Sequence, residues 1–326
     1  MQPALNLRPL SVGEMLDRAF HLYFKHFALF VSLLAVVLVP LYIAQYFQMK
    51  DLFDVFSTML TSRSAGGVPT PQQMDKLTQM GGVNGWLGGE LGVIMLLMPF
   101  AYAAVVIAMS RVYLGQPVTF GECYRAAGRR WLAMFMLIVL WTVVFILALI
   151  ALIVFFALIG SAGALLMQGA AKVSSVAAVL TIIVFLAVTI VAIAVTLMLY
   201  MTVAMSFVAV VVERTDPMKA FSSGFARIFS RGQTGRSAAV ALALFGMQLG
   251  ITLVGYAAGG LAAYFLHSAA LYVIVVSLAG LFFLPFAILT VGVLYYDIRI
   301  RREGFDLQML ADQMSATSGL PPPAPA

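Results

Sequence analysis

The chain has 326 residues, of which 63% are hydrophobic and only 10% are charged, and its mean hydropathy is +1.02. Soluble domains are about 45–50% apolar and about 25% charged, so the composition excludes a soluble enzyme, a nucleic-acid-binding protein and a disordered chain. The net charge of +6 does not indicate nucleic acid, because basic residues beside apolar spans act as topology signals. The remaining fold class is all-α, a polytopic membrane helix bundle.

Six membrane spans are expected, because about 20 apolar residues cross about 30 Å of hydrocarbon. The third is expected to end early, since Gly160, Gly163 and Gly169 loosen the helix. The fourth contains no Gly, Pro, Asn or Asp with which to turn, so one overlong helix is expected. The uncharged stretches, in chain order, are 27–49, 91–110, 131–171, 173–212 and 237–296, and the last divides at Leu266-His267-Ser268 into two helices.

Three connecting segments are predicted to be short amphipathic helices at the headgroup level. Ser11 and Thr119 each precede a glutamate by three residues, as in a capping box, and Asp216 precedes a proline. The apolar faces of these helices contact either lipid headgroups or the ends of neighbouring spans, and the sequence leaves both open.

The connectors and spans together predict a threefold internal repeat. Met-Pro-Phe-Ala at 98–101 in the second span matches Leu-Pro-Phe-Ala at 284–287 in the sixth. Each repeat would consist of an interfacial amphipathic helix followed by a two-span hairpin. The expected repeats cover about 11–112, 119–213 and 216–297.

Outside the repeats, little extramembrane structure is expected. Residues 1–314 are predicted to form a single integral membrane domain. The outer loop 50–90 is expected to hold a short amphipathic helix near 52–60. The tail 315–326, which contains three consecutive prolines, is expected to be disordered.

Lys and Arg residues predict the orientation. Lys50, Arg63, Lys76 and Lys172 lie on one side of the predicted spans, and the other fifteen of the 19 lie on the opposite side. The positive-inside rule then places both termini in the cytoplasm. The single cysteine, Cys123, would lie in a reducing compartment, which agrees with its having no partner for a disulfide.

No catalytic residue, metal site or cofactor site is predicted. The proposed spans contain no Asp, Glu, Lys, Arg or His, so ion-coupled transport has little support. The chain lacks a nucleophile elbow and a metalloprotease motif. Under the predicted topology, His21 and His26 lie across the membrane from His267, so the three cannot form one metal site.

Two groups of residues are candidate interaction sites. Small residues four apart allow helices to approach closely, so the glycine row of the fifth span is expected to pack inside the bundle, with homodimerisation as the alternative. The arginines after the sixth span are expected to form ion pairs with Glu14, Asp17 and Glu122 of the connectors, and lipid contact is the alternative. The glycine row is Gly246, Gly250, Gly255 and Gly259, and the arginines are Arg299, Arg301 and Arg302.

Both ends of the chain resemble a known bacterial family. The segments Leu-Arg-Pro-Leu-Ser-Val-Gly-Glu-Met-Leu-Asp-Arg at 7–18 and Tyr-Tyr-Asp-Ile-Arg-Ile-Arg-Arg-Glu-Gly-Phe-Asp-Leu at 295–307 are similar to the glycerophosphoryl diester phosphodiesterase membrane domain. The resemblance implies a multi-span bacterial inner-membrane protein. Relatives that carry the catalytic barrel have a His-Arg-Gly-type signature, and no histidine here is followed by Arg-Gly, so the enzymatic name does not transfer.

The function expected from these observations is that of a non-enzymatic integral inner-membrane protein, a scaffold or accessory to an envelope or lipid-related process. A transporter or lipid-handling protein is one alternative. A membrane subunit of a separately encoded phosphodiesterase is another. The expected partners are the lipid bilayer and a membrane or envelope protein, and no nucleic acid or cofactor is expected.

Overall fold

The computed structural model describes residues 9–64, 71, 86–169, 175–266, 269–304 and 308. These residues form nine α-helices and no strand, which confirms the all-α prediction. One short helix is followed by two long helices, and this order occurs three times. The helices are α1 (Val12–Lys25), α2 (Phe27–Ser64), α4 (Trp86–Tyr113), α5 (Phe120–Gly128), α6 (Trp131–Gly169), α7 (Ser175–Val212), α8 (Pro217–Ile228), α9 (Thr234–Leu266) and α10 (Ala269–Glu303).

Six helices in the described part of the chain are long and apolar enough to cross a bilayer. Their number and order are as predicted, and α9 and α10 separate where two spans were expected. The chain is therefore a multi-pass membrane protein. The candidate spans are Phe27–Phe47, Ile94–Tyr113, Trp131–Leu158, Ile182–Val212, Thr234–Ala262 and Ala270–Glu303.

Two predicted helix boundaries need correction. The third helix does not end at Gly160 or Gly163, since α6 continues as one helix of 39 residues and ends at Gly169, although its apolar candidate span ends at Leu158. A glycine costs a helix only about 1 kcal/mol, which is too little to end an apolar helix whose backbone has no other hydrogen-bond partners in lipid. The amphipathic segment near 52–60 is helical, but it continues the first span within α2, which has 38 residues. The expected overlong fourth helix is confirmed as α7, also of 38 residues.

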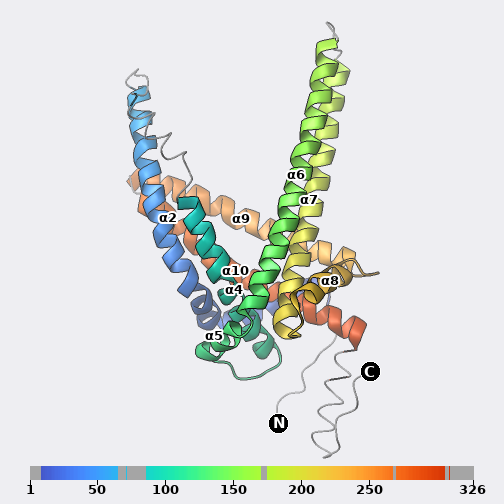
Figure 1. Cartoon of the computed structure of the whole chain (residues 1–326). Helices are drawn as coiled ribbons and strands as arrows, with labels where there is room; N and C mark the ends of the chain where they lie inside the picture. The colour runs from blue at the N-terminus through green and yellow to red at the C-terminus, as the bar shows by residue number, and fades with distance from the viewer. Residues whose placement is uncertain are drawn as a thin grey trace, which may run out of the picture.

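The last helix, α10, lies at the centre of the bundle. It packs against α1, α2, α4, α7 and α9, and every residue from 285 to 298 is buried. The short helices α5 and α8 lie at the same end of the molecule (Figure 1). There α8 contacts the carboxyl end of α10 through Arg227 and Glu303, α5 packs on α4, and α1 packs on α10. We call this end of the bundle, which carries α1, α5 and α8, the connector end.

The hairpin of α6 and α7 stands apart from the other long helices (Figure 1). Its root at the connector end is buried, as at Leu137 and Met205. Beyond the root, large apolar side chains are exposed on both helices, and the rings of Phe156 and Phe185 pack on each other with centroids 5.2 Å apart. We call residues 145–169 and 175–196 the arm.

The short helices begin largely as predicted. Ser11 and Glu14 form the full capping box of α1, and Asp216 with its proline begins α8. The second box is wrong, because neither half of it forms: Thr119 makes no side-chain cap, and the Glu122 carboxylate accepts from Arg111 at 2.8 Å.

The connectors combine the two contacts that the sequence left open. In α1, Met15, Ala19 and Tyr23 are buried against the bundle, whereas Phe20 and Phe24 are exposed. One face of this helix therefore packs on protein, and the aromatic rings beside it are free to contact headgroups.

Candidate functional site

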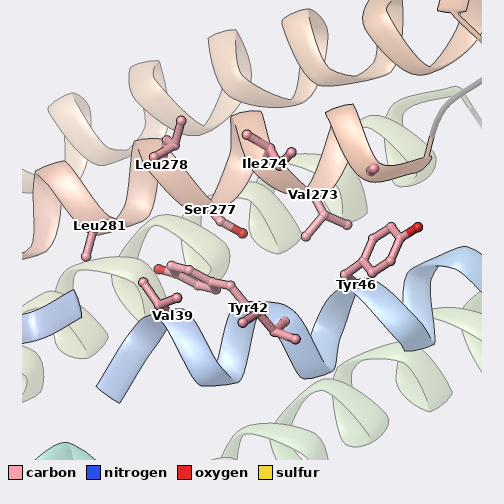
Figure 2. A pocket seen from close by; sticks show the side chains of 10 residues that line it. Val39, Tyr42, Tyr46, Val273, Ile274, Ser277, Leu278 and Leu281 are labelled. Atoms are coloured by element: carbon pink, nitrogen blue, oxygen red, sulfur yellow. The ribbon is translucent and has the colours of Figure 1, made fainter. Parts of the chain in front are cut away.

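An apolar groove of about 360 Å³ lies between α2 and α10. Tyr42 and Tyr46 line it from α2, and side chains of the segment 270–281 line it from α10 (Figure 2). The Tyr42 ring lies across the groove, and a Cβ on Gly280 would be only 3.1 Å from its hydroxyl oxygen. Apart from the two tyrosine hydroxyls and Ser277, the lining side chains are hydrocarbon.

A polar network at the connector end is centred on Asp297, whose side chain is fully buried. Its Oδ1 accepts from the backbone N–H of Leu10 at 2.7 Å. Its Oδ2 accepts from Arg236 of α9 and from Arg301 of α10, both at 2.9 Å. Both arginines also donate to the carbonyl oxygen of Leu10. A buried carboxylate is costly unless it is paired, so this group holds the segment before α1 against α9 and α10.

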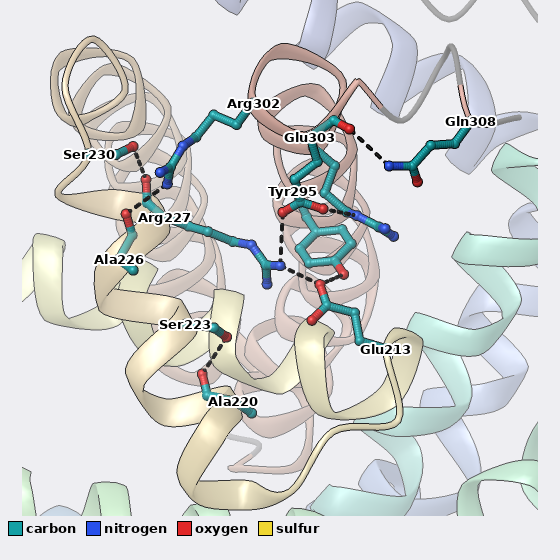
Figure 3. A network of polar contacts seen from close by, with 11 residues as sticks. Glu213, Ala220, Ser223, Ala226, Arg227, Ser230, Tyr295, Arg302, Glu303 and Gln308 are labelled. Atoms are coloured by element: carbon teal, nitrogen blue, oxygen red, sulfur yellow. Dashed lines mark hydrogen bonds and ion pairs between the residues drawn. The ribbon is translucent and has the colours of Figure 1, made fainter. Parts of the chain in front are cut away.

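A second group joins α7, α8 and α10 through Arg227, which is buried on α8. Its guanidinium pairs with Glu213 just after α7 and with Glu303 of α10, the latter at 3.2 Å (Figure 3). The Tyr295 hydroxyl donates to the same oxygen of Glu213, and the guanidinium lies 5.1 Å from the centre of the Tyr295 ring. The sequence suggested only a topology role for Arg227, because its partners are distant in the chain.

Aromatic rings connect α1 to the bundle beside these ion pairs. Tyr113 of α4 stacks on Tyr296 of α10 with centroids 4.9 Å apart, and the guanidinium of Arg18 lies 5.4 Å from the centre of the Tyr113 ring. The hydroxyls of Ser110 and Tyr296 are 2.6 Å apart and hydrogen-bonded. These contacts position side chains for packing rather than around a cavity.

The arginines after the predicted sixth span contact carboxylates of α10 and backbone carbonyls of neighbouring segments. Arg299 pairs with Glu303 at 2.8 Å. Arg301 contacts the Asp297 group described above, and Arg302 donates to the carbonyl oxygen of Ala226 in α8 at 3.1 Å.

The predicted carboxylate partners of these arginines need correction. Arg301 and Arg302 reach the connectors through backbone carbonyls, and Glu122 pairs with Arg111 instead. The helix ends before Gly304, which follows α10 with a φ of +59°, a conformation that glycine adopts without strain. Residues 305–307 and the tail 315–326 lie outside the described residues.

The glycine row of the fifth span does not act as one packing surface. Gly255 and Gly259 are buried against Ala279 and Tyr272 of α10. Gly246 and Gly250 are exposed, and a Cβ at either would meet no described atom within 4 Å. The expected packing inside the bundle is therefore wrong for Gly246 and Gly250.

Closer helix contacts occur at two glycines outside that row. A Cβ on Gly224 of α8 would lie 2.7 Å from the carbonyl oxygen of Thr202 in α7, and one on Gly292 of α10 would lie 1.9 Å from Met109 of α4. Neither glycine has another glycine four residues away, so a search of the sequence for Gly-x-x-x-Gly motifs does not find them.

The cysteine and the possible metal ligands of the chain do not form a reactive site among the described residues. Cys123 is buried, and burial raises the pKa of its thiol to about 11, so little reactive thiolate forms at neutral pH. Among the described residues, no group of three His, Cys, Asp or Glu side chains is placed to hold a metal ion. His267 lies outside those residues.

The chain matches no protein-family model, no curated protein and no solved structure. The resemblance of its two ends to the phosphodiesterase membrane domain therefore stays a prediction. Function has to be argued from the groove, the polar network and the arm themselves.

Replacing Arg301 by Glu is expected to destabilise the protein by about 3 kcal/mol, because Asp297 would keep its burial and lose half of its counter-charge. Arg302→Glu is the matched control and should cost much less, since among the described residues Arg302 donates to a backbone carbonyl and pairs with no carboxylate. Thermal unfolding in a zwitterionic detergent measures both. A loss that appeared only in membranes with anionic lipid would instead assign Arg301 to lipid binding.

Gly224→Ala is expected to lower stability by about 1–3 kcal/mol, because the new methyl group overlaps the backbone of α7. The same change at Gly250, where the added Cβ meets open space, should leave the unfolding temperature unchanged or raise it slightly. Equal losses at both positions would show that Gly250 is covered by another chain.

Proposed function

We propose that this chain is a non-enzymatic scaffold or accessory protein of an envelope process, held in the bacterial inner membrane with both termini in the cytoplasm. The observation that supports this most directly is the arm. Large apolar side chains are exposed along both of its helices.

The arm is longer than a bilayer requires. At 1.5 Å per residue, the 38 residues of α7 extend about 57 Å, whereas the hydrocarbon layer is about 30 Å thick. The root lies at the connector end, where the Trp131 ring stacks on Phe100 with centroids 5.7 Å apart, as an interfacial tryptophan would. A hairpin standing upright from this root would carry about half its length beyond the hydrocarbon.

The distal surface is too apolar to face water. Leu158 is 63% exposed and Ile182 66% exposed, and covering a large aliphatic side chain contributes about 1.5–3 kcal/mol. A membrane or envelope protein that packs on the arm would supply this cover. The alternative is a strongly inclined hairpin covered by lipid alone.

The buried charged side chains of the connector end support a non-enzymatic role, because they form ion pairs between helices. Asp297, Arg227 and their partners hold helices together, and the guanidinium groups of Arg227, Arg236 and Arg301 each lie against a carboxylate of this chain. The groove between α2 and α10 favours the second candidate function, a lipid-handling role.

The proposed orientation is tested by cysteine labelling with an impermeant reagent. Native Cys123 cannot report it, because the buried thiol with its raised pKa would react slowly on either side. In a Cys123→Ser background, we expect Ser64→Cys, at the far end of α2, to be modified in intact cells. Gln116→Cys, at an exposed position of the connector end, should react only after permeabilisation. The reverse pattern would invert the topology.

The scaffold role is tested by a photo-crosslinking amino acid at Leu158 in native membranes. Leu132, at the root of the same helix, is the matched control, because the two leucines are 63% and 61% exposed. We expect Leu158 to give a discrete protein adduct and Leu132 to give lipid adducts. Lipid adducts alone at both positions would contradict the proposal and favour an inclined arm, and a phosphodiesterase in the adduct would identify the chain as its membrane subunit.

A further inference from the structure

The groove between α2 and α10 lies in the half of the membrane away from the connector end. Counted from Phe27, where α2 begins, Val39 lies about 18 Å and Tyr46 about 28 Å along the helix axis. The hydrocarbon layer is about 30 Å thick, so the groove runs from the middle of the bilayer to its far surface. Tyr46 therefore lies at the level where tyrosine is enriched in membrane proteins.

The length of the groove matches one leaflet. On the α10 side it extends from Ala270 to Leu281, which is about 16 Å at 1.5 Å per residue. Half of the hydrocarbon thickness is about 15 Å. An extended acyl chain of a phospholipid in the far leaflet covers the same depth.

The cross-section of the groove also fits a hydrocarbon chain. Its floor contains the buried side chains Val273 and Leu281, and its rims contain the exposed side chains Ile43 and Ile274, so the groove opens to the surrounding lipid. The volume of about 360 Å³ is at the lower end of ligand pockets. A helix about 10 Å across would fill roughly 1,200 Å³ over the same length, which is too much for this space.

The groove also has a closed end. The Tyr42 ring lies between the two helices with its hydroxyl toward the Leu281 end (Figure 2), and the place left by the missing side chain of Gly280 receives the tyrosine hydroxyl. A larger residue at 280 would push this ring back, so the depth of the groove depends on the pair of Tyr42 and Gly280.

We propose that this groove is a binding site for one acyl chain of a far-leaflet phospholipid, with the headgroup at the level of Tyr46 and the chain end near Leu281. The lining selects hydrocarbon and carries no charged side chain, so the headgroup is not specified by the groove. The site is separate from the arm and does not depend on the scaffold role.

The test uses the full-length protein in phosphatidylcholine vesicles that contain a phosphatidylcholine with a photoreactive group in its acyl chain. Labelled residues are mapped by mass spectrometry. We expect Val273 and Leu281, which line the groove and are buried, to be labelled several-fold more than Leu253 of α9, which is 60% exposed and lies outside the arm. Simple contact with bulk lipid would follow exposure and give the opposite order.

Filling the groove supplies the control. Ser277→Phe should reduce groove labelling to the level of Leu253, and Thr196→Phe, on the exposed arm, should leave it unchanged. Thermal unfolding checks that each variant is folded, and Val273→Phe replaces Ser277→Phe if the latter is not. Groove labelling at or below the level of Leu253 in the unmodified protein, or undiminished in a folded groove-filling variant, would overturn the proposal.

Discussion

The hydrogen bond from the backbone N–H of Leu10 to the buried carboxylate of Asp297 is the interaction on which the connector end depends. Moving a carboxylate out of water costs several kcal/mol, and Asp297 recovers this cost from a backbone N–H and two guanidinium groups at 2.7–2.9 Å. Because α10 packs against five other helices, a contact with the last turns of α10 holds a segment to the whole bundle. The group of Arg227 adds α7 and α8 to the same helix end.

The other end of the bundle has no comparable crosslink among the described residues. Apolar helices gain little from associating in lipid, because acyl chains are as apolar as leucine side chains, and close packing or polar contacts must hold the helices together. At the connector end, Gly224 and Gly292 allow such close packing. The arm instead exposes large aliphatic side chains from both of its helices. The separation of the arm and the open groove both follow from this difference between the two ends.

The sequence predicted the features that depend on local patterns. Spans follow from apolar length and connectors from capping residues, so both were found, whereas the glycines of α6 were given too much weight. Contacts between distant residues were not predictable. Nothing near Asp297 in the chain indicates Leu10 as a partner, and spacing alone could not show that Gly250 points away from the bundle while Gly259 faces Tyr272. The family resemblance stays untested by the comparisons.

The polar contacts also connect the three short-long-long units in a closed order. Arg111, at the end of the second long helix, pairs with Glu122 of α5, and Glu213, after the fourth, pairs with Arg227 of α8. Asp297, near the end of the sixth, holds the segment before α1. Each unit is thus fastened to the start of the next and the last to the first, although the charges change sign between the first two pairs. Leu10 completes this arrangement, because without its backbone N–H the buried carboxylate of Asp297 would keep Arg236 and Arg301 on Oδ2 and lose its partner on Oδ1.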